Sequence, residues 1–173
     1  NNANFFNQDI NLWNVANVGN MSNMFNSADA FNQDLNSWNT ATVKDMSNMF
    51  SGASSFDGAI SSWQVDAVTN MSFMFANATS FDRAIPLWNV SNVLNMDSMF
   101  LNTIYNQSMG SWSVQDCLSM NNMFKNNPNV NQPIGLWNTS SCESMISMFE
   151  NCTSFNRDLS AWDVSGVTVS YTH

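Results

Sequence analysis

Apolar and polar positions follow one pattern along this chain, and the pattern returns about every 25 residues. Position 1 of the repeat is usually aromatic, and copies begin near residues 6, 31, 56, 81, 105, 130 and 155. The copy that begins at residue 81 is one residue shorter than the others. A unit this short cannot bury its apolar face alone, so the pattern predicts about seven rungs that stack on one another.

The first half of each copy predicts a short strand. Position 5 is apolar, position 8 is Trp, position 10 is Val or Thr, and position 13 is Val or Cys. The step of two from position 8 to position 10 places both side chains on one face of a strand. The spacing matches the strand segment of leucine-rich repeats. All seven tryptophans lie at position 8, where we expect a structural core: Trp13, Trp38, Trp63, Trp88, Trp112, Trp137 and Trp162.

The second half of each copy predicts a short capped helical turn. Positions 16, 19 and 20 are Met, Met and Phe in six copies, which is the spacing of one helical face. Position 15 is Asn, Asp or Ser, each of which caps helix starts well. The predicted fold is a leucine-rich-repeat-like solenoid forming a single domain over residues 1–173, with a short parallel β-strand and a short capped helical turn in each rung.

The composition argues against two classes of binding partner, nucleic acids and membranes. The chain is 10% charged with a net charge of −9, and its only cations are Lys44, Arg83, Lys125 and Arg157. Nucleic acids and anionic membrane surfaces require clustered basic residues, so neither is expected as a partner. No apolar run approaches the roughly 20 residues of a membrane-spanning helix, so we expect no direct membrane insertion.

The sequence offers little material for catalysis or for a cofactor. His173 is the only histidine, and it is terminal. We therefore expect no enzyme, no catalytic residue, no cofactor and no metal centre. Carboxylates at positions 2 and 4 are interpreted as turn caps, with a weak calcium row as the alternative. These are Asp57, Asp82, Asp9, Asp34 and Asp158.

The three cysteines do not form a disulfide framework. Cys117 and Cys142 replace Val at position 13 of neighbouring copies, which favours buried thiols that act as small apolar groups. Cys152, at position 23, is a candidate disulfide partner of Cys142.

Seven Asn-x-Ser/Thr sequons are candidate N-glycosylation sites if the protein is secreted by a glycosylating cell. A chain rich in Asn and Ser also produces such sequons by chance. Asn20 and Asn70 double as caps, so Asn77, Asn89, Asn138 and Asn151 are the better candidates. The full set is Asn20, Asn70, Asn77, Asn89, Asn106, Asn138 and Asn151.

The segments FNQDLNSWNT, TNMSFMFANATSF and WNVSNVLNMDSMF resemble the tandem repeats of the BspA-like leucine-rich-repeat surface proteins. The resemblance covers nearly the whole chain, because Trp, Met-x-x-Met-Phe and Phe-Asn-Gln-Asp recur together in register. It implies an extracellular or cell-surface location and a role in adhesion or structure. It supplies no catalytic residue, since the shared motif is a packing motif.

These observations lead us to expect a non-enzymatic extracellular structural or adhesive repeat module. The chain starts and stops within the repeat frame, which suggests head-to-tail self-association into a fibre or neighbouring repeats in a longer array. The alternative is a recognition solenoid that binds a partner protein or a surface glycan on its strand face. Leu12, Leu87 and Leu136 at position 7 would then form a contact patch.

Overall fold

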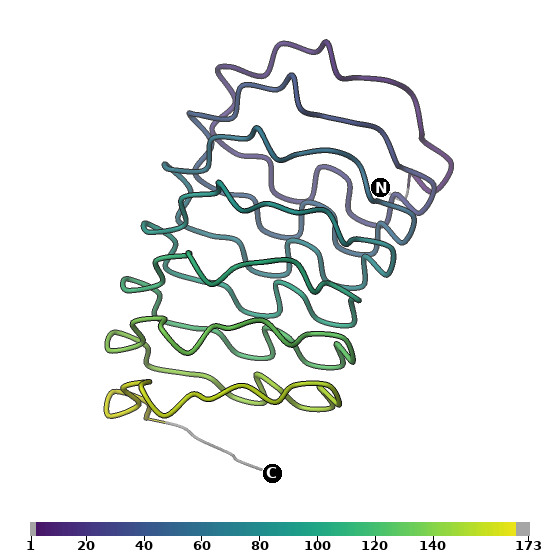
Figure 1. Ribbon diagram of the computed structural model, residues 1–173. Coiled ribbons are helices and arrows are strands. Elements are labelled where there is room, and N and C mark those ends of the chain that lie inside the picture. Colours follow the sequence, from purple (N-terminus) through teal and green to yellow (C-terminus); the bar gives the residue numbers. More distant parts are fainter. Residues whose placement is uncertain (1–2, 169–173) are drawn as a thin grey trace.

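A computed structural model describes residues 3–168. The chain winds into a column of stacked coils, and the colours along Figure 1 run in sequence order from one end of the column to the other. Each coil corresponds to one sequence repeat and lies between the coils that precede and follow it. We number them coil 1 to coil 7, with first residues at 6, 31, 56, 81, 105, 130 and 155.

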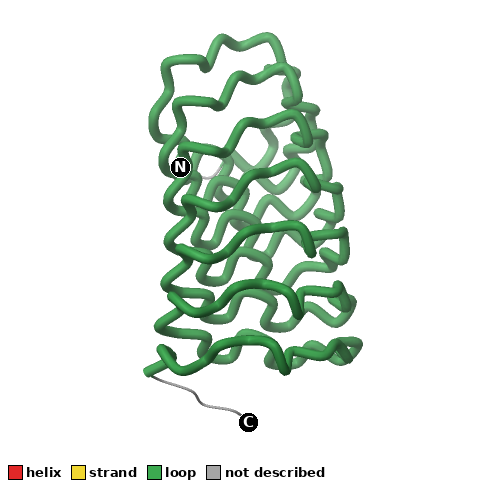
Figure 2. Tube along the Cα trace, turned by 60° about the vertical axis from the view of Figure 1, so that its left-hand side comes forward, coloured by secondary structure: helices red, strands yellow, loops and turns green. Residues whose placement is uncertain are grey.

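The predicted strands and helical turns are absent from residues 3–168, which contain no α-helix and no extended strand. Figure 2 accordingly shows the described trace as loop throughout. The sheet-like pairing consists of isolated parallel bridges between position-15 residues of neighbouring coils. They are Asn20 with Asp45, Asp45 with Asn70, Asn70 with Asn95, Asn95 with Ser119, and Ser119 with Ser144. The prediction of a leucine-rich-repeat-like solenoid of strands and capped helical turns was therefore wrong.

The helical turn fails because position 18 adopts a left-handed backbone conformation. Its φ lies between 51° and 59° in coils 1–6, whereas a right-handed helix requires negative φ. The Met24 amide instead donates to the Met21 carbonyl at 3.3 Å. That bond, with a positive φ at Asn23, fits a type II β-turn. Position 22 repeats the arrangement, because Ser27 has a φ of 56° and the Ala28 amide donates to the Phe25 carbonyl at 3.1 Å.

Amides between these turn bonds join each coil to the next. In coils 1 to 5, the amides of positions 16, 18, 20 and 22 donate to the carbonyls of positions 15, 17, 19 and 21 in the following coil. From coil 1 the four donors are Met21, Asn23, Phe25 and Ser27, and their acceptors are Asp45, Ser47, Met49 and Ser51. Local and inter-coil bonds thus alternate along positions 16 to 22, which we call the turn side of the column. Its buried backbone groups are therefore paired.

The predicted strand around Trp fails for a related reason. In coil 3 the Trp63 amide donates to the Ile60 carbonyl at 3.2 Å, and the Val68 amide donates to the Val65 carbonyl at 3.0 Å. Because the amides of Trp63 and Val68 donate within these local turns, they cannot donate to a neighbouring coil as the amides of a strand would. The indole makes the inter-coil bond instead, because Trp63 Nε1 donates to the Leu35 carbonyl of coil 2 at 2.9 Å.

Aromatic side chains fill the column from coil to coil. Trp38, Trp63 and Trp88 stack in sequence with ring centroids 6.2 Å apart. Trp112, Trp137 and Trp162 form a second run at 6.2–6.4 Å. Position 1 and position 20 add two further stacks beside the indoles. Their members are Phe6, Phe31, Phe56, Phe81 and Tyr105 in one, and Phe25, Phe50, Phe75, Phe100, Phe124 and Phe149 in the other.

The junction of coil 4 and coil 5 departs from this regularity. Among the described residues, Trp88 and Trp112 do not form a stacked pair, and buried Trp112 Nε1 has no hydrogen-bond partner. The Tyr105 hydroxyl is also buried without a partner. Coil 4 is the short copy, so the lost residue coincides with an interruption of the Trp stack.

Candidate functional site

Side chains at position 2 form a polar ladder along the column. In coils 1 to 6 the Asn or Asp side chain accepts a hydrogen bond from the position-2 amide of the next coil, at 2.8–3.1 Å. The members are Asn7, Asn32, Asp57, Asp82, Asn106, Asn131 and Asn156. Position-3 side chains reinforce the ladder, for example Gln33 Nε2, which donates to the Asn7 carbonyl at 3.2 Å.

The predicted carboxylates are engaged in backbone bonds of this kind. Asp57 and Asp82 belong to the position-2 ladder, and Asp34 accepts the Ala59 amide of the next coil at 2.7 Å. Asp9 and Asp158 each cap the amide two residues later. The Ser160 amide and hydroxyl lower the pKa of exposed Asp158. Asp9 and Asp158 therefore cap turns, as interpreted from sequence, whereas Asp34, Asp57 and Asp82 join coils. Within residues 3–168 no group of three His, Cys, Asp or Glu side chains converges.

The three thiols are free in the structure. Cys142 Sγ donates to the Ser144 carbonyl at 3.3 Å, whereas Cys152 Sγ donates to the Phe124 carbonyl at 3.0 Å. The candidate disulfide between Cys142 and Cys152 is therefore not formed. Burial raises the pKa of Cys117 to about 12 and that of Cys152 to about 11, and it also raises the pKa of Cys142. The thiols thus fill core space in their protonated form.

The sequons differ in whether the amide nitrogen is engaged. Asn89 Nδ2 donates to Asp66 at 2.7 Å, and Asn151 Nδ2 donates to Asn126 at 2.6 Å. Asn138 is exposed, and its Oδ1 accepts the Ser140 amide. Asn77 is also exposed and accepts a bond from Asn102 through Oδ1. Geometry thus favours Asn77 and Asn138, whose Nδ2 atoms make no hydrogen bond among the described residues.

The remaining sequons lie in structural turns. Asn20 and Asn70 accept the amides of Ser22 and Ser72 at 2.7 and 3.1 Å, which is an Asx turn instead of the predicted helix cap. Asn106 is half-buried, and its Oδ1 accepts bonds from the Asn131 amide and Gln132.

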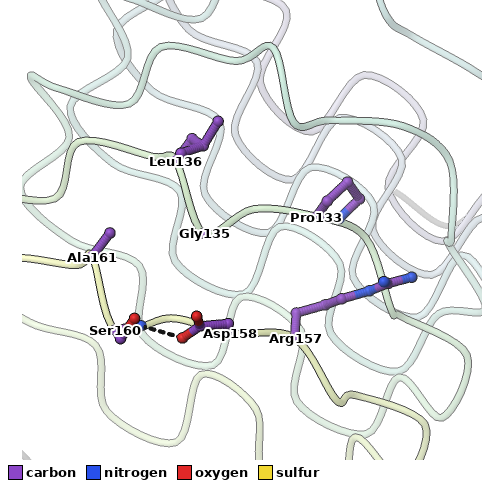
Figure 3. A pocket seen from close by; sticks show the side chains of 7 residues that line it. All are labelled: Pro133, Gly135, Leu136, Arg157, Asp158, Ser160 and Ala161. Carbon is purple, nitrogen blue, oxygen red and sulfur yellow. Dashed lines mark hydrogen bonds between the residues drawn. The ribbon is translucent and has the colours of Figure 1, made fainter.

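A hollow of about 320 Å³ opens on the outer face between coil 6 and coil 7. Figure 3 shows Pro133, Gly135 and Leu136 on one coil above Asp158, Ser160 and Ala161 on the next, with Arg157 extending to the side. Leu136 is 91% exposed, as are the position-7 leucines of coil 1 and coil 4, Leu12 at 90% and Leu87 at 83%. These three leucines therefore lie outside the core.

A second hollow, of about 380 Å³, lies at the coil 1 end of the column. Trp13 is 55% exposed and Met24 is 39% exposed, whereas their equivalents Trp38 and Met49 in coil 2 are 2% and 0% exposed. The other apolar residues of the lining are Ala3, Phe6, Ile10, Phe25 and Ala28. We call this surface the coil 1 end face.

An asparagine ladder at position 22 was missed by sequence reasoning. Asn102, Asn126 and Asn151 each donate through Nδ2 to the Asn one coil earlier, at 2.6–2.7 Å. Its signal was Asn at the same position in successive copies. Taken one copy at a time, these Asn residues gave no sign that their side chains bond to each other across coils.

Comparison with known proteins gives one family. The family described as "Mycoplasma protein of unknown function, DUF285" matches residues 1–105 and again residues 85–172. The chain belongs to the DUF285 family. The two overlapping matches fit a chain built from tandem DUF285 repeats. Neither a curated protein nor a solved structure matches this DUF285 chain. Within residues 3–168 there is no helix of the length and apolarity needed to cross a membrane.

Proposed function

We propose that this DUF285 chain is a non-enzymatic structural or adhesive repeat module of the cell surface. The observation that carries the proposal is the polar ladder at position 2, which bonds every coil to the next through equivalent side chains. Such bonds require only another copy of the same coil. They therefore suit a column with a structural role, which keeps a fixed length and exposes its outer surface to partners.

The surface location rests on the resemblance of the repeats to BspA-like surface proteins. The Asn-rich ladders support the structural part of the proposal, because Asn amides hydrogen-bond neighbouring coils without charge repulsion between them.

Antibodies raised against the folded chain test the location in cells that express it. We expect labelling of intact cells by immunogold electron microscopy, with no increase after permeabilisation. An antibody against a cytoplasmic protein is the matched control and should label permeabilised cells only. Labelling that requires permeabilisation would overturn the surface assignment.

A second candidate function is recognition of a partner protein on the outer face. The observation that favours it is Leu136, 91% exposed beside the hollow between coil 6 and coil 7. Beads coated with the chain or with Leu136→Ser test this candidate against host or neighbouring cells. Recognition predicts that the variant loses bead binding, whereas general adhesion by the column predicts equal binding.

A further inference from the structure

We infer that Cys117 and Cys142 form a covalent cross-linking site, at which oxidation joins coil 5 to coil 6 through a disulfide bond. The two cysteines occupy position 13 of neighbouring coils, whereas Cys152 lies at position 23. The structure contains both thiols in the reduced form. Oxidation on the cell rests on the proposed surface location, because extracellular surroundings are oxidising.

The local structure is the same at both cysteines. The amide of each one donates to the carbonyl three residues earlier, at 2.9–3.0 Å. Cys117 Sγ donates to the Ser119 carbonyl and Cys142 Sγ donates to the Ser144 carbonyl, in both cases at 3.3 Å. Each Sγ also lies 3.6–3.7 Å from the position-14 carbonyl of the preceding coil. The two side chains therefore have the same orientation and are displaced from each other by one coil.

Hydrogen bonds hold the two coils together directly beside the cysteines. The Glu143 amide donates to the Leu118 carbonyl at 2.8 Å, and the position-15 residues of these coils form a parallel bridge. Cys142 Sγ itself lies 3.6 Å from the Leu118 carbonyl, and Leu118 follows Cys117 in the chain. Chains paired in this way lie about 4.8 Å apart. Disulfides join Cα atoms about 4.4–6.8 Å apart, so side-chain rotation and a small backbone movement bring the two sulfurs together.

Packing alone does not require cysteine at position 13. Val43, Val68 and Val93 occupy this position in coils 2 to 4 and are fully buried. Cysteine replaces valine only in two neighbouring copies, so each of these thiols has the other beside it in the stack. Burial raises the pKa of Cys117 to about 12, and the nearby Cys142 thiol adds to the rise.

The bond forms by exchange with a low-molecular-weight disulfide such as oxidised glutathione. The thiolate of one cysteine attacks the glutathione disulfide and releases one glutathione thiol. The second cysteine attacks the resulting mixed disulfide, which forms the Cys117–Cys142 bond and releases a second glutathione thiol. The chain thereby loses two electrons and two protons, which the oxidant gains. Because both sulfurs are buried, the exchange requires transient opening of the coils, and the finished bond is shielded from reductants.

Oxidation of the purified chain tests the inference. The reduced chain is incubated with oxidised glutathione in urea below its unfolding transition, so that the coils open transiently and burial does not block the reaction. Remaining thiols are alkylated in denaturant, and cleavage after Lys and Glu residues places the three cysteines in different peptides. We expect mass spectrometry to show the Cys117 and Cys142 peptides joined to each other, with the Cys152 peptide separate.

The melting temperature provides a second measurement. The oxidised wild type should melt at a higher temperature than the same protein after reduction, because the bond constrains the unfolded chain. Cys152→Ala should show the same shift, since Ala occupies position 23 in coils 1 to 3. Cys117→Val should show no shift.

Val68→Cys in a Cys142→Val background is the matched control. This variant keeps two thiols at position 13, but it separates them by an intervening coil, so it should not cross-link. Cross-linking of this control to the same extent as the wild type would overturn the inference. A wild-type chain in which Cys117 and Cys142 stay unjoined, or in which either one joins Cys152, would overturn it as well. Each of these results leaves the surface location untouched, since immunogold labelling tests that separately.

Discussion

Tryptophan at position 8 has two roles in this fold: its ring fills the interior of the column, and its Nε1 donates a hydrogen bond to the preceding coil. Trp63 is 3% exposed and Trp112 is 4% exposed, so they bury similar area. They differ in two contacts. Trp63 Nε1 donates to Leu35 and the ring stacks on both Trp38 and Trp88. Trp112 Nε1 is unpaired, and among the described residues its only stacked indole is Trp137. The pair therefore compares an indole that is hydrogen-bonded and stacked on both sides with one that is unpaired and stacked on one side.

We expect Trp63→Phe to lower the free energy of unfolding by about 2–4 kcal/mol, from lost volume and a lost buried hydrogen bond. Trp112→Phe should cost about 1–3 kcal/mol less, because it removes a buried donor that has no acceptor. Urea denaturation followed by far-ultraviolet circular dichroism measures both. Equal losses would show that neither the indole bond nor the second stacked indole adds to stability.

The thiol at position 13 of coil 5 makes stability depend on pH. Burial raises the pKa of Cys117 to about 12, with Cys142 adding to the effect, whereas an unfolded thiol titrates near about 8.5. The folded state favours the protonated thiol, so its contribution is fully present below about pH 8.5 and falls as pH rises toward 12.

Cys117→Val isolates this contribution, because Val43, Val68 and Val93 occupy the same position in other coils. Denaturation of both proteins at pH 8 and pH 10.5 should show a larger loss of stability for the wild type. Parallel losses would assign the alkaline effect to other groups, such as Tyr105, whose pKa is also raised by burial.

At the scale of the element, the decisive unit is a pair of turns with left-handed residues at positions 18 and 22 in coils 1 to 6. Position 18 is Asn in three of the six copies, a residue that tolerates left-handed φ. Phe73 occupies this position in coil 3 with a φ of 58°, although a bulky side chain is strained there. Phe73 is 39% exposed, whereas Phe75 two residues later is fully buried, so burial offsets the strain at Phe73 only in part.

Phe73→Asn should therefore raise the free energy of unfolding by about 1 kcal/mol, through relief of the left-handed strain. Phe73→Ala is the control, because alanine keeps a Cβ in the left-handed region and gains no local side-chain hydrogen bond. Thermal melting of the wild type, Phe73→Asn and Phe73→Ala measures the change in stability. A destabilised Phe73→Asn would indicate that the ring packs more productively than its exposure suggests.

The same turns explain which part of the fold was accessible from sequence. The period and the first residue of each coil followed directly from the recurrence of Trp and of Met-x-x-Met-Phe. The helical turn did not, because residues three apart approach each other in a β-turn as well as in a helix. Asn23 and Asn48 carried the discriminating signal, since Asn recurring between two apolar positions is typical of a left-handed turn residue.

The candidate site was harder to predict because its bonds join different coils. Asn151 is a valid sequon by sequence, and only stacking brings its Nδ2 to Asn126 of the previous coil. Asp82 similarly resembled a cation ligand until the Asn106 amide of coil 5 was placed against it. The sequence shows at which repeat positions such residues recur. Their hydrogen-bond partners depend on how neighbouring coils align, which the sequence does not show.

At the scale of the whole molecule, the junction between coil 4 and coil 5 is irregular, because among the described residues it lacks both the indole bond and the Trp stack. Coils 4 and 5 retain the bonds of the turn side, such as the Met96 amide to the Ser119 carbonyl at 2.9 Å. At position 8 of the same junction, the stack of indole rings is interrupted and Trp112 Nε1 is unpaired. In a column each coil is stabilised by its neighbours, so a weak junction on one side is where local opening should cost least.

Native-state hydrogen exchange compares this junction with regular ones at a single repeat position. The position-14 amides of Thr69, Leu118 and Glu143 each donate to the position-14 carbonyl of the preceding coil, at 2.8–2.9 Å. The Leu118 bond crosses the irregular junction, and the other two cross regular ones. After correction for intrinsic rates, we expect Leu118 to exchange faster than Thr69 and Glu143, because its junction lacks the indole bond and the Trp stack. Equal protection at the three amides would show that the turn side alone sets the opening free energy, and that the short copy in coil 4 does not weaken the column.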